Sequence, residues 1–519
     1  MHSSKIFVAI LLVGIMLVLS LTACEDTKPN NTENTVEGTT LAEETKVFNN
    51  ESGNNNLENN NHVQNPGGQP IIQVESTTES TEESTEVESA TEKAEVSATQ
   101  GLVFTVNEGN TAYSVTDYVG SNTEIVIPAL YNGLPVTSIG NNAFSHSNLT
   151  SITIPSSIVS IGSGAFYNCS SLANIAIPNN VTNIGFGAFW DCTGLVSITL
   201  PFVGATKDGT FNTNFGYIFG SSYYNEVVPT SLKIVVITGG TVIGDDAFYD
   251  CSNLTEIIIP DSITSIGHGA FLGCNNLTSI TIPFIETATY DTSNNTYLGY
   301  LFGSSSDSYS NIPTSLKTVI ITSGNSIGKK AFANCDNLIN VTICNGVTVI
   351  GDDAFYDCDN LTSVAISDSI THIGEDAFRG CNNLNAVHIA DLAAWCNIKF
   401  DNTTANPLYY AQNFYLNHTL ITNLIIPEGV TNITNEAFRR CPNVTSVLIP
   451  DSVTHIGYWA FMDCRELNKV IFENPNNWWY SNKTPATNGT AISAVDLLDP
   501  STAATYLTST YKSYYWNRS

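Results

Sequence analysis

Cysteine is the residue type with the most chemical potential in this sequence. The chain has twelve cysteines, and nine of them lie three residues after a phenylalanine: Cys169, Cys192, Cys251, Cys274, Cys335, Cys358, Cys381, Cys441 and Cys464. Disulfide frameworks show irregular spacing, and side chains stacked in parallel suit disulfide geometry poorly. We therefore expect nine buried free thiols that pack as small apolar groups. No role is predicted for Cys344 and Cys396.

The sequence contains no complete motif for a metal site or for a catalytic site. The chain contains no Cys-x-x-Cys and no His-x-x-x-His pair. Acidic pairs such as Asp245-Asp246 could serve glycosidase chemistry, but neighbouring repeats carry Asn141-Asn142 or Lys329-Lys330 at the same place. We interpret these pairs as solvated starts of short helical turns, where acids are favoured. We expect no catalytic residue, no metal and no cofactor.

Aromatic residues give the candidate ligand-binding site. Two longer repeats share the patterns Gly-Tyr-Ile/Leu-Phe-Gly-Ser-Ser and Pro-Thr-Ser-Leu-Lys, which random loops would not. Exposed aromatics are favoured at binding surfaces. The predicted ligand-binding residues are Tyr217, Phe219, Tyr223, Tyr224, Tyr297, Tyr300 and Phe302. Two alternatives stay open: these side chains dock the inserts onto the fold, or the strand face, with residues such as Ser279 and Thr281, binds instead.

A repeat of about 23 residues must position all of these side chains. In Leu277-Thr278-Ser279-Ile280-Thr281-Ile282-Pro283 the last four residues before the proline alternate as in a half-buried strand, and the proline ends the ladder. An Ile-x-x-Ile-Gly segment follows, where Gly267 is expected to allow a turn with positive φ. Ala270-Phe271 then supplies one small and one large core residue.

Repeats of this length indicate a solenoid, because a single turn cannot bury its apolar face alone. We predict a β-rich, right-handed leucine-rich-repeat solenoid with a parallel sheet of fourteen strands on one face, an N-terminal hairpin cap and a C-terminal cap. The predicted parts are a signal peptide (1–23), an acidic disordered linker (24–100), the solenoid (101–472) with longer repeats near 201–231, 283–315 and 390–420, and a closing cap (473–519).

The pattern Leu-x-x-Ile-x-Ile-Pro-x-x-Ile-x-x-Ile-Gly-x-x-Ala-Phe-x-x-Cys resembles the BspA-like bacterial surface leucine-rich-repeat proteins. The resemblance covers roughly residues 101–472, where the whole pattern recurs about ten times. It implies adhesion or ligand binding at the cell surface without catalysis. It carries over no binding residue, because the shared motif is the structural core.

The N-terminus indicates export. Lys5 precedes an apolar run from Ile6 to Leu19 that is too short to span a bilayer. Leu21-Thr22-Ala23-Cys24 resembles a bacterial lipobox, which implies cleavage before Cys24 and a diacylglycerol on its thiol. The linker that follows carries sixteen acidic residues and three lysines between Glu25 and Glu95, a composition typical of a solvated tether.

The net charge of the chain limits the kinds of partner that it is expected to bind. The formal net charge of −30 argues against nucleic acid, whose binding requires a basic face. We predict an exported, lipid-anchored, monomeric surface protein that binds an extracellular protein or glycan and touches membrane only through its anchor. The alternatives are a passive spacer at the cell surface and a non-catalytic targeting part of a polysaccharide-acting system. The sequence does not identify the ligand.

Overall fold

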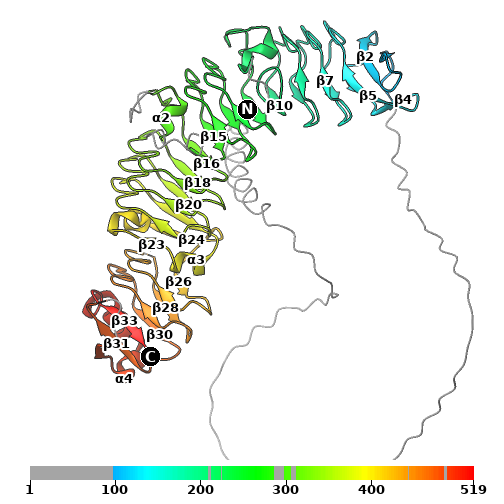
Figure 1. Ribbon diagram of the computed structural model, residues 1–519. Coiled ribbons are helices and arrows are strands. Elements are labelled where there is room, and N and C mark those ends of the chain that lie inside the picture. The colour runs from blue at the N-terminus through cyan, green and yellow to red at the C-terminus, as the bar shows by residue number, and fades with distance from the viewer. Residues whose placement is uncertain are drawn as a thin grey trace, which may run out of the picture. The chain divides into compact units, whose positions relative to one another are not determined.

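The computed structural model describes residues 98–207, 212–223, 225–285, 297–304, 311–441, 443–483 and 488–519. The predicted signal peptide, nearly all of the linker, Cys24 and Tyr224 lie outside these residues. Within them, turn after turn of the chain stacks in a row, with one strand of each turn on a shared face (Figure 1). The predicted leucine-rich-repeat solenoid is confirmed.

The main face consists of parallel strands in sheets of two, eleven and three strands, the second ending in an antiparallel β25 (Thr419–Leu420). Its parallel strands are β3 (Glu124–Val126), β6 (Ser151–Thr153), β8 (Asn174–Ala176), β10 (Ser197–Leu200), β11 (Ile234–Ile237), β13 (Glu256–Ile258), β15 (Ser279–Ile282), β16 (Thr318–Ile321), β18 (Asn340–Ile343), β20 (Ser363–Ile366), β22 (Ala386–Ile389), β24 (Asn413–Leu416), β26 (Asn423–Ile425), β28 (Ser446–Ile449) and β30 (Lys469–Phe472). The predicted strands are present, and β24 is an additional strand inside the third longer repeat.

A second line of short strands runs along the stack. It comprises β5 (Leu134–Ile139), β7 (Ser160–Ile161), β9 (Asn183–Ile184), β12 (Val242–Ile243), β14 (Ser265–Ile266), β17 (Ser326–Ile327), β19 (Val349–Ile350), β21 (His372–Ile373), β23 (Lys399–Phe400), β27 (Asn432–Ile433) and β29 (His455–Ile456). Most of these strands contain the second isoleucine of Ile-x-x-Ile-Gly, whereas β23 has Phe400 at that place. The sequence did not predict this line, because most of its strands are two residues long and show no alternation.

Both ends of the stack are covered, as predicted. The hairpin of β1 (Leu102–Val106) and β2 (Tyr113–Tyr118) pairs in parallel with β5, so it covers the second line of strands rather than the main sheet. β4 (Leu130–Tyr131) forms a hairpin with β5. The C-terminal cap contains β31 (Trp478–Ser481), β32 (Thr490–Ala491), α4 (Ala494–Leu498), α5 (Pro500–Thr505), η4 (Tyr506–Thr510) and β33 (Tyr515–Arg518). β33 pairs antiparallel with β29 and closes the second line.

The phenylalanines form a buried column along the stack. Phe144, Phe166 and Phe189 are fully buried with nearly parallel rings, and their centroids are 5.4 and 5.3 Å apart. Each turn also bonds to the next through the backbone here, since the Phe166 amide donates to the Ala188 carbonyl at 2.7 Å. The column is therefore held by ring contacts and by hydrogen bonds together.

The repeat cysteines lie beside this column as free, buried thiols, which confirms the prediction. The Cys192 Sγ donates to the Phe166 carbonyl of the preceding turn at 3.1 Å, and the Cys358 Sγ donates to the Phe332 carbonyl at 3.0 Å. Burial raises the pKa of the Cys169 thiol to about 12. The two unplaced cysteines are also buried: Cys396 in α3 (Leu392–Cys396), and Cys344 directly after β18.

The repeat needs the glycine of Ile-Gly for a different reason from the one predicted. Gly267 does not have positive φ; a Cβ there would lie 2.3 Å from the Asp245 backbone nitrogen of the preceding turn. The left-handed residue comes two positions later, at Gly269 here and at Asp246 (φ 51°) in the preceding turn. Ile-Gly therefore requires glycine for close approach of two backbones.

The acidic pairs do not start helical turns. Asp246 and Asp353 are left-handed, with φ of 51° and 53°. The Asp245 carboxylate accepts a hydrogen bond from the His268 amide of the next turn at 2.8 Å, as the Asn141 side chain does from Ser163. These residues are therefore turn and stacking residues rather than helix starts.

We predict that the repeat thiols of the folded protein resist a thiol reagent such as Ellman's reagent at pH 8. Burial keeps them protonated and inaccessible, and only the thiolate reacts. After unfolding in guanidinium without reductant, the nine repeat cysteines should all titrate. Rapid reaction in the folded state, or mainly disulfides after unfolding, would contradict the buried-thiol column.

Candidate functional site

The two matched inserts are turns of the solenoid rather than excursions from it. In the first, η1 (Phe215–Phe219) lies between two regular turns: the Phe189 amide donates to the Ile218 carbonyl, and the Phe215 amide donates to the Ala247 carbonyl, both at 2.8 Å. In the second, α2 (Leu298–Leu301) bonds in the same way to the turns on either side. Each insert therefore takes the place of an Ala-Phe turn in the stack.

This placement corrects the prediction for three of the seven aromatic residues. Phe219 and Phe302 are fully buried and extend the phenylalanine column, with ring centroids 6.3 Å from Phe189 and 6.0 Å from Phe271. Tyr297 is only 4% exposed. These side chains pack the core, as the docking alternative had it, and cannot present a surface to a ligand.

Three of the predicted aromatics reach the surface. Tyr223 is 83% exposed, and Tyr217 and Tyr300 are half-buried. Tyr217 lies edge-on to Phe186 of the preceding turn, with ring centroids 5.4 Å apart. Tyr300 lies edge-on to His268 in the same way, at 5.0 Å. The two inserts thus share a shape but meet different neighbours.

Beside the first insert lies a surface groove that the sequence did not predict, here called the aromatic groove. Its volume is about 440 Å³, and its lining residues come from three successive turns: Asn141, Asn142, Ser163, Gly164, Tyr167, Phe186, Gly187 and Trp190. Trp190 is 50% exposed and Phe186 is 37% exposed. The groove therefore presents large apolar rings to solvent.

Two glycines make room for the groove. Gly164 and Gly187 occupy the left-handed position before Ala-Phe, with φ of 61° at both. Most other turns have a side chain at that position, such as Asp246, Lys330 or Glu436. The absence of two side chains in adjacent turns leaves the rings of Tyr167 and Trp190 accessible.

The second insert does not repeat this groove. At the place of Phe186 it faces His268, and at the place of Trp190 it faces Leu272, whose side chain packs under Gly303. In the first insert Gly220 lies over the Trp190 ring, so closely that a Cβ added at Gly220 would lie 3.2 Å from the indole. The indole is thus fixed from one side and exposed on the other.

The strand face, the alternative site, is a continuous polar and aliphatic surface. Ser279 and Thr281 of β15 are half-buried, and Val236 and Ile258 continue the row beside Thr281. Towards its end, His388 stacks on Tyr415 with ring centroids 4.7 Å apart. The face is suited to broad contact with a ligand.

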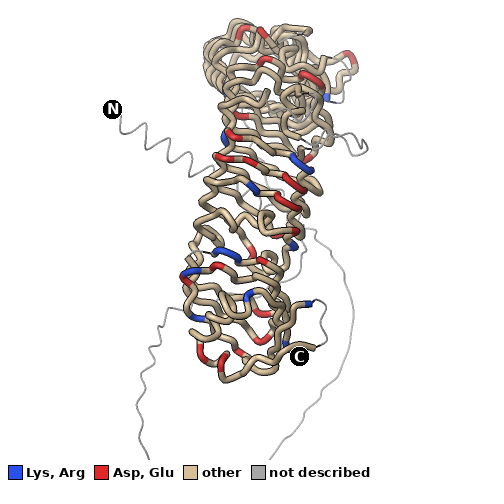
Figure 2. The backbone as a smooth tube through the Cα atoms, turned by 90° about the vertical axis from the view of Figure 1, so that its left-hand side faces the viewer, with Lys and Arg blue, Asp and Glu red and all other residues tan. Residues whose placement is uncertain are grey.

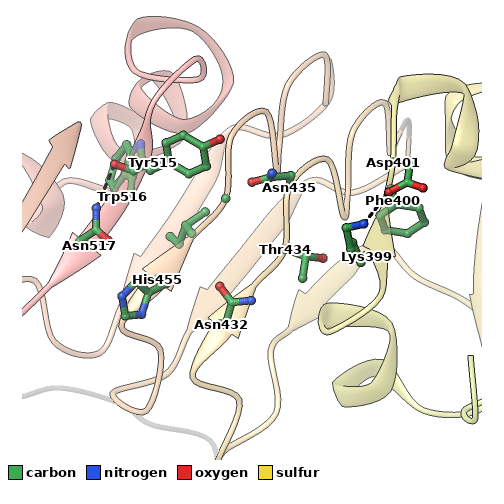
Figure 3. Close-up of a pocket in the computed structure, with 12 residues that line it drawn as sticks. Lys399, Phe400, Asp401, Asn432, Thr434, Asn435, His455, Tyr515, Trp516 and Asn517 are labelled. Carbon is green, nitrogen blue, oxygen red and sulfur yellow. Dashed lines mark hydrogen bonds and ion pairs between the residues drawn. The ribbon is translucent and has the colours of Figure 1, made fainter. Parts of the chain in front are cut away.

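A second groove of about 390 Å³ lies where the second line of strands is interrupted between β23 and β27 (Figure 3). Its lining is mostly polar and includes Lys399, Asp401, Asn435, His455 and Tyr515. The Asp401 carboxylate accepts hydrogen bonds from Lys399 and, in β21, from His372, both at 2.7 Å. The His372 contact joins β21 to the end of β23, and the Lys399 contact lies within one turn, so we interpret both as structural.

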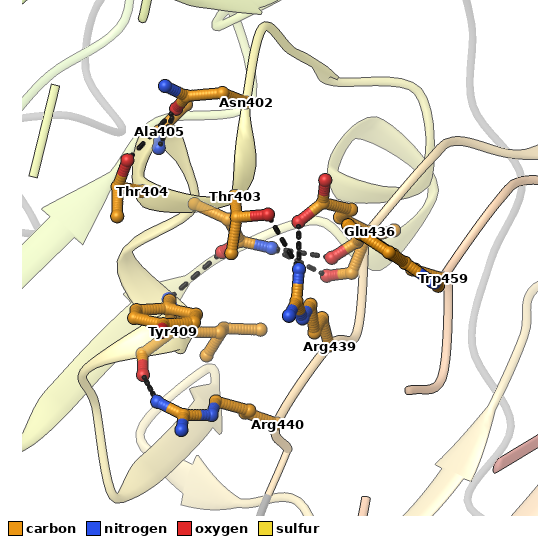
Figure 4. A network of polar contacts seen from close by, with 12 residues as sticks. Asn402, Thr403, Thr404, Ala405, Tyr409, Glu436, Arg439, Arg440 and Trp459 are labelled. Carbon is orange, nitrogen blue, oxygen red and sulfur yellow. Dashed lines mark hydrogen bonds and ion pairs between the residues drawn. The ribbon is translucent and has the colours of Figure 1, made fainter. Parts of the chain in front are cut away.

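The third longer repeat joins the following turn through an arginine network (Figure 4). It contains α3, β23, η2 (Thr403–Ala405) and η3 (Pro407–Tyr409), so it is a full turn of the solenoid. The Arg439 guanidinium donates to Glu436 at 3.0 Å and to Thr403 at 2.6 Å, and it lies 4.6 Å from the Trp459 ring centroid. This buried arginine acts as a clamp between turns.

In the described part of the chain, neither the distribution of charged residues nor the residue types that bind metals indicate a further binding site. Acidic residues outnumber basic ones along the turns, and the basic residues do not gather on one face (Figure 2). No group of three or more His, Cys, Asp or Glu residues there could hold a metal ion. No described helix is long and apolar enough to cross a membrane.

Stacked turns with parallel strands and a leucine, isoleucine and phenylalanine core define a leucine-rich-repeat solenoid. The BspA type leucine rich repeat region matches six copies over residues 137–219, 241–290, 304–415 and 409–484, more than half of the chain. The chain therefore belongs to the BspA-type leucine-rich-repeat family, as its sequence predicts.

Three solved structures are among those similar to this chain. A leucine rich cell surface protein from Faecalibacterium prausnitzii is 25% identical, with 73% of this chain and 94% of that chain covered and a TM-score of 0.26. A leucine-rich repeat protein from Bacteroides ovatus is 24% identical, with 72% and 94% covered and a TM-score of 0.26. One from Bacteroides capillosus is 28% identical over 27% of this chain and 95% of its own, with a TM-score of 0.21. A search of curated proteins found no match.

We predict that Phe219→Ala destabilises the protein by about 3–5 kcal/mol, the usual cost of emptying a large buried aromatic site. Tyr217→Ala, two residues away and half-buried, should cost about 1 kcal/mol or less. Chemical denaturation followed by circular dichroism measures both. Equal losses for the two variants would mean that the surface tyrosine is as much a core residue as Phe219.

We also predict that Asp401 stabilises the fold in a pH-dependent way. Burial alone would raise the pKa of Asp401, but hydrogen bonds from Lys399 and His372 outweigh burial and lower it. A carboxyl whose pKa is lower in the folded state adds stability above its unfolded pKa of about 3.9, and that stability is lost as the pH falls through the folded value. Asp401→Asn should therefore cost more at pH 7 than at pH 3 in urea denaturation, and an equal cost at both would refute this role.

Proposed function

We propose that this chain is a lipid-anchored bacterial surface protein that binds a macromolecular ligand through its repeat surface. Family membership supports the binding role, since such solenoids expose long faces and carry no cofactor in the scaffold itself. The lipobox-like Leu21 to Cys24 supports the anchor, and the acidic linker would hold the solenoid away from the membrane. The proposal assigns the protein no catalytic residue.

The exposed aromatic rings beside the first insert are the observation that carries the binding role. The repeat does not require an exposed ring at Phe186, because most other turns have a polar residue there, such as Asp245 or Lys329. Trp190 is at a position where other turns also have large side chains such as Tyr249, but it is 50% exposed, and Tyr223 is 83% exposed. Clustered exposed aromatics are typical of binding surfaces, where their burial supplies much of the affinity. A passive spacer would have no use for them.

The anchor is tested by Cys24→Ala. We expect the variant to lose lipid attachment, since it lacks the thiol to which the lipobox-like motif implies that diacylglycerol is joined. It should either leave the membrane fraction or remain as an uncleaved precursor. Metabolic labelling with a fatty acid, followed by cell fractionation, reports both effects. Cys396→Ala, at a free and buried thiol, is the control. Unchanged labelling and fractionation of the Cys24 variant would exclude the anchor.

Binding is tested with the full-length chain, purified in mild detergent, on arrays of glycans and extracellular-matrix proteins. We expect specific retention on at least one class of ligand, and loss of that retention when Trp190 and Tyr217 are both replaced by alanine. A protein that binds neither class would be a spacer.

A further inference from the structure

We propose that the aromatic groove binds a neutral glycan chain. The inference rests on the proposed function, because it names the ligand class and the site of a protein proposed to bind a macromolecule. It places binding in one groove, across three turns, rather than on rings spread over both inserts.

Three rings line the groove, and a fourth lies beside it. The ring centroids of Tyr167 and Trp190 are 5.4 Å apart, and Phe186 lies edge-on to Tyr217 of the first insert at the same distance. The C–H face of a pyranose is apolar and packs against an aromatic face, so both surfaces lose contact with water. Two ring pairs in neighbouring turns can hold successive sugar units of one chain.

The remaining lining residues supply neutral hydrogen-bonding groups. Asn141, Asn142 and Ser163 contribute amides and a hydroxyl, and such groups both donate and accept, as sugar hydroxyls do. Asn141 is held in place by its bond to the Ser163 amide at 2.8 Å. The groove therefore joins apolar platforms to fixed polar groups, the usual composition of a small-molecule or saccharide site.

Charge separates neutral glycans from other ligands. No aspartate, glutamate, lysine or arginine lines the groove, and Asp191 directly follows Trp190 on an acidic chain. An anionic polysaccharide would lose its hydration without gaining a cationic partner and would meet a net negative protein. A neutral polysaccharide carries no such penalty.

The groove can be closed without disturbing the fold. Gly187 has φ of 61°, a conformation that asparagine adopts at the same repeat position in Asn142, at 55°. A Cβ added at Gly187 would meet nothing nearer than 3.4 Å. Gly187→Asn should therefore fold normally while its side chain fills the floor between Trp190 and Phe186.

Matched controls exist in other turns. Tyr249 occupies the repeat position of Trp190 and is 38% exposed, but Asp246 fills the left-handed position beside it. Gly269 occupies the position of Gly187 in the regular turn beside the second insert, between His268 and Leu272. Tyr249→Ala and Gly269→Asn thus repeat the two changes away from the aromatic groove.

The experiment is affinity electrophoresis of the full-length chain through gels that contain one soluble polysaccharide each. Mixed-linkage β-glucan, xyloglucan, galactomannan and pullulan are the neutral probes, and polygalacturonate and heparin are the anionic ones. We expect at least one neutral probe to retard the protein, and neither anionic probe to do so. Trp190→Ala and Gly187→Asn should each weaken the retardation constant at least tenfold, and the two control variants less than twofold.

Three results would overturn the inference: no retardation by any neutral probe, retardation only by anionic probes, or retardation that Trp190→Ala and Gly187→Asn leave unchanged. Thermal unfolding by circular dichroism shows whether a variant is folded; if Trp190→Ala unfolds, Gly187→Asn alone decides. Binding to a matrix protein on the arrays without glycan retardation would keep the proposed function and exclude this inference. Binding to neither would exclude both.

Discussion

The close approach of one backbone turn to the next is the constraint on which this structure depends. At Gly185 and Gly267 a Cβ would lie 2.3 Å from a backbone nitrogen of the preceding turn. Contact this close lets the amide of one turn bond to the carbonyl of another, as between Phe166 and Ala188. It also sets the spacing at which phenylalanine rings stack in parallel. The residues that recur in the repeat are therefore set mainly by close packing and by backbone hydrogen bonds between turns, rather than by any ligand or reaction.

The same constraint decides where surface chemistry can vary. Each regular turn passes through a left-handed residue before Ala-Phe, and that residue can be glycine, an acid, lysine or even tryptophan, as at Trp459. Its side chain is not part of the phenylalanine column, so its type can vary. In some turns it joins neighbouring turns, as Glu436 and Trp459 do around Arg439. A turn can thus acquire or lose a groove by one substitution. Glycines at 164 and 187, in adjacent turns, leave such an opening beside the exposed rings of Trp190 and Phe186.

Much of the fold could be predicted because its signals are strong and local. Alternation before a proline indicates the strands of the main face, and the fixed Phe-x-x-Cys spacing indicates buried thiols. The second line of strands gives no such signal, since two residues such as Ser265 and Ile266 cannot show a period. Ile-Gly was assigned positive φ because glycine often has it, and only coordinates reveal a close approach between turns 23 residues apart.

The candidate site was only partly predictable, and the reason is the ambiguity of aromatic residues in a repeat. The segment Gly-Tyr-Ile-Phe-Gly suggests an exposed loop, yet its phenylalanine occupies the place of the phenylalanine in Ala-Phe. The sequence does not reveal this match, because isoleucine rather than alanine precedes that phenylalanine. Trp190 and Phe186 were missed because they stand inside a regular repeat. Comparison between turns could have found Phe186, since other turns have Ser163 or His268 at its position, but Tyr249 and Tyr356 stand at the position of Trp190. The turn before the second insert has His268 and Leu272 in place of Phe186 and Trp190. A ligand that recognises the rings beside the first insert therefore has no equivalent platform beside the second, which favours one groove over a bridge between inserts.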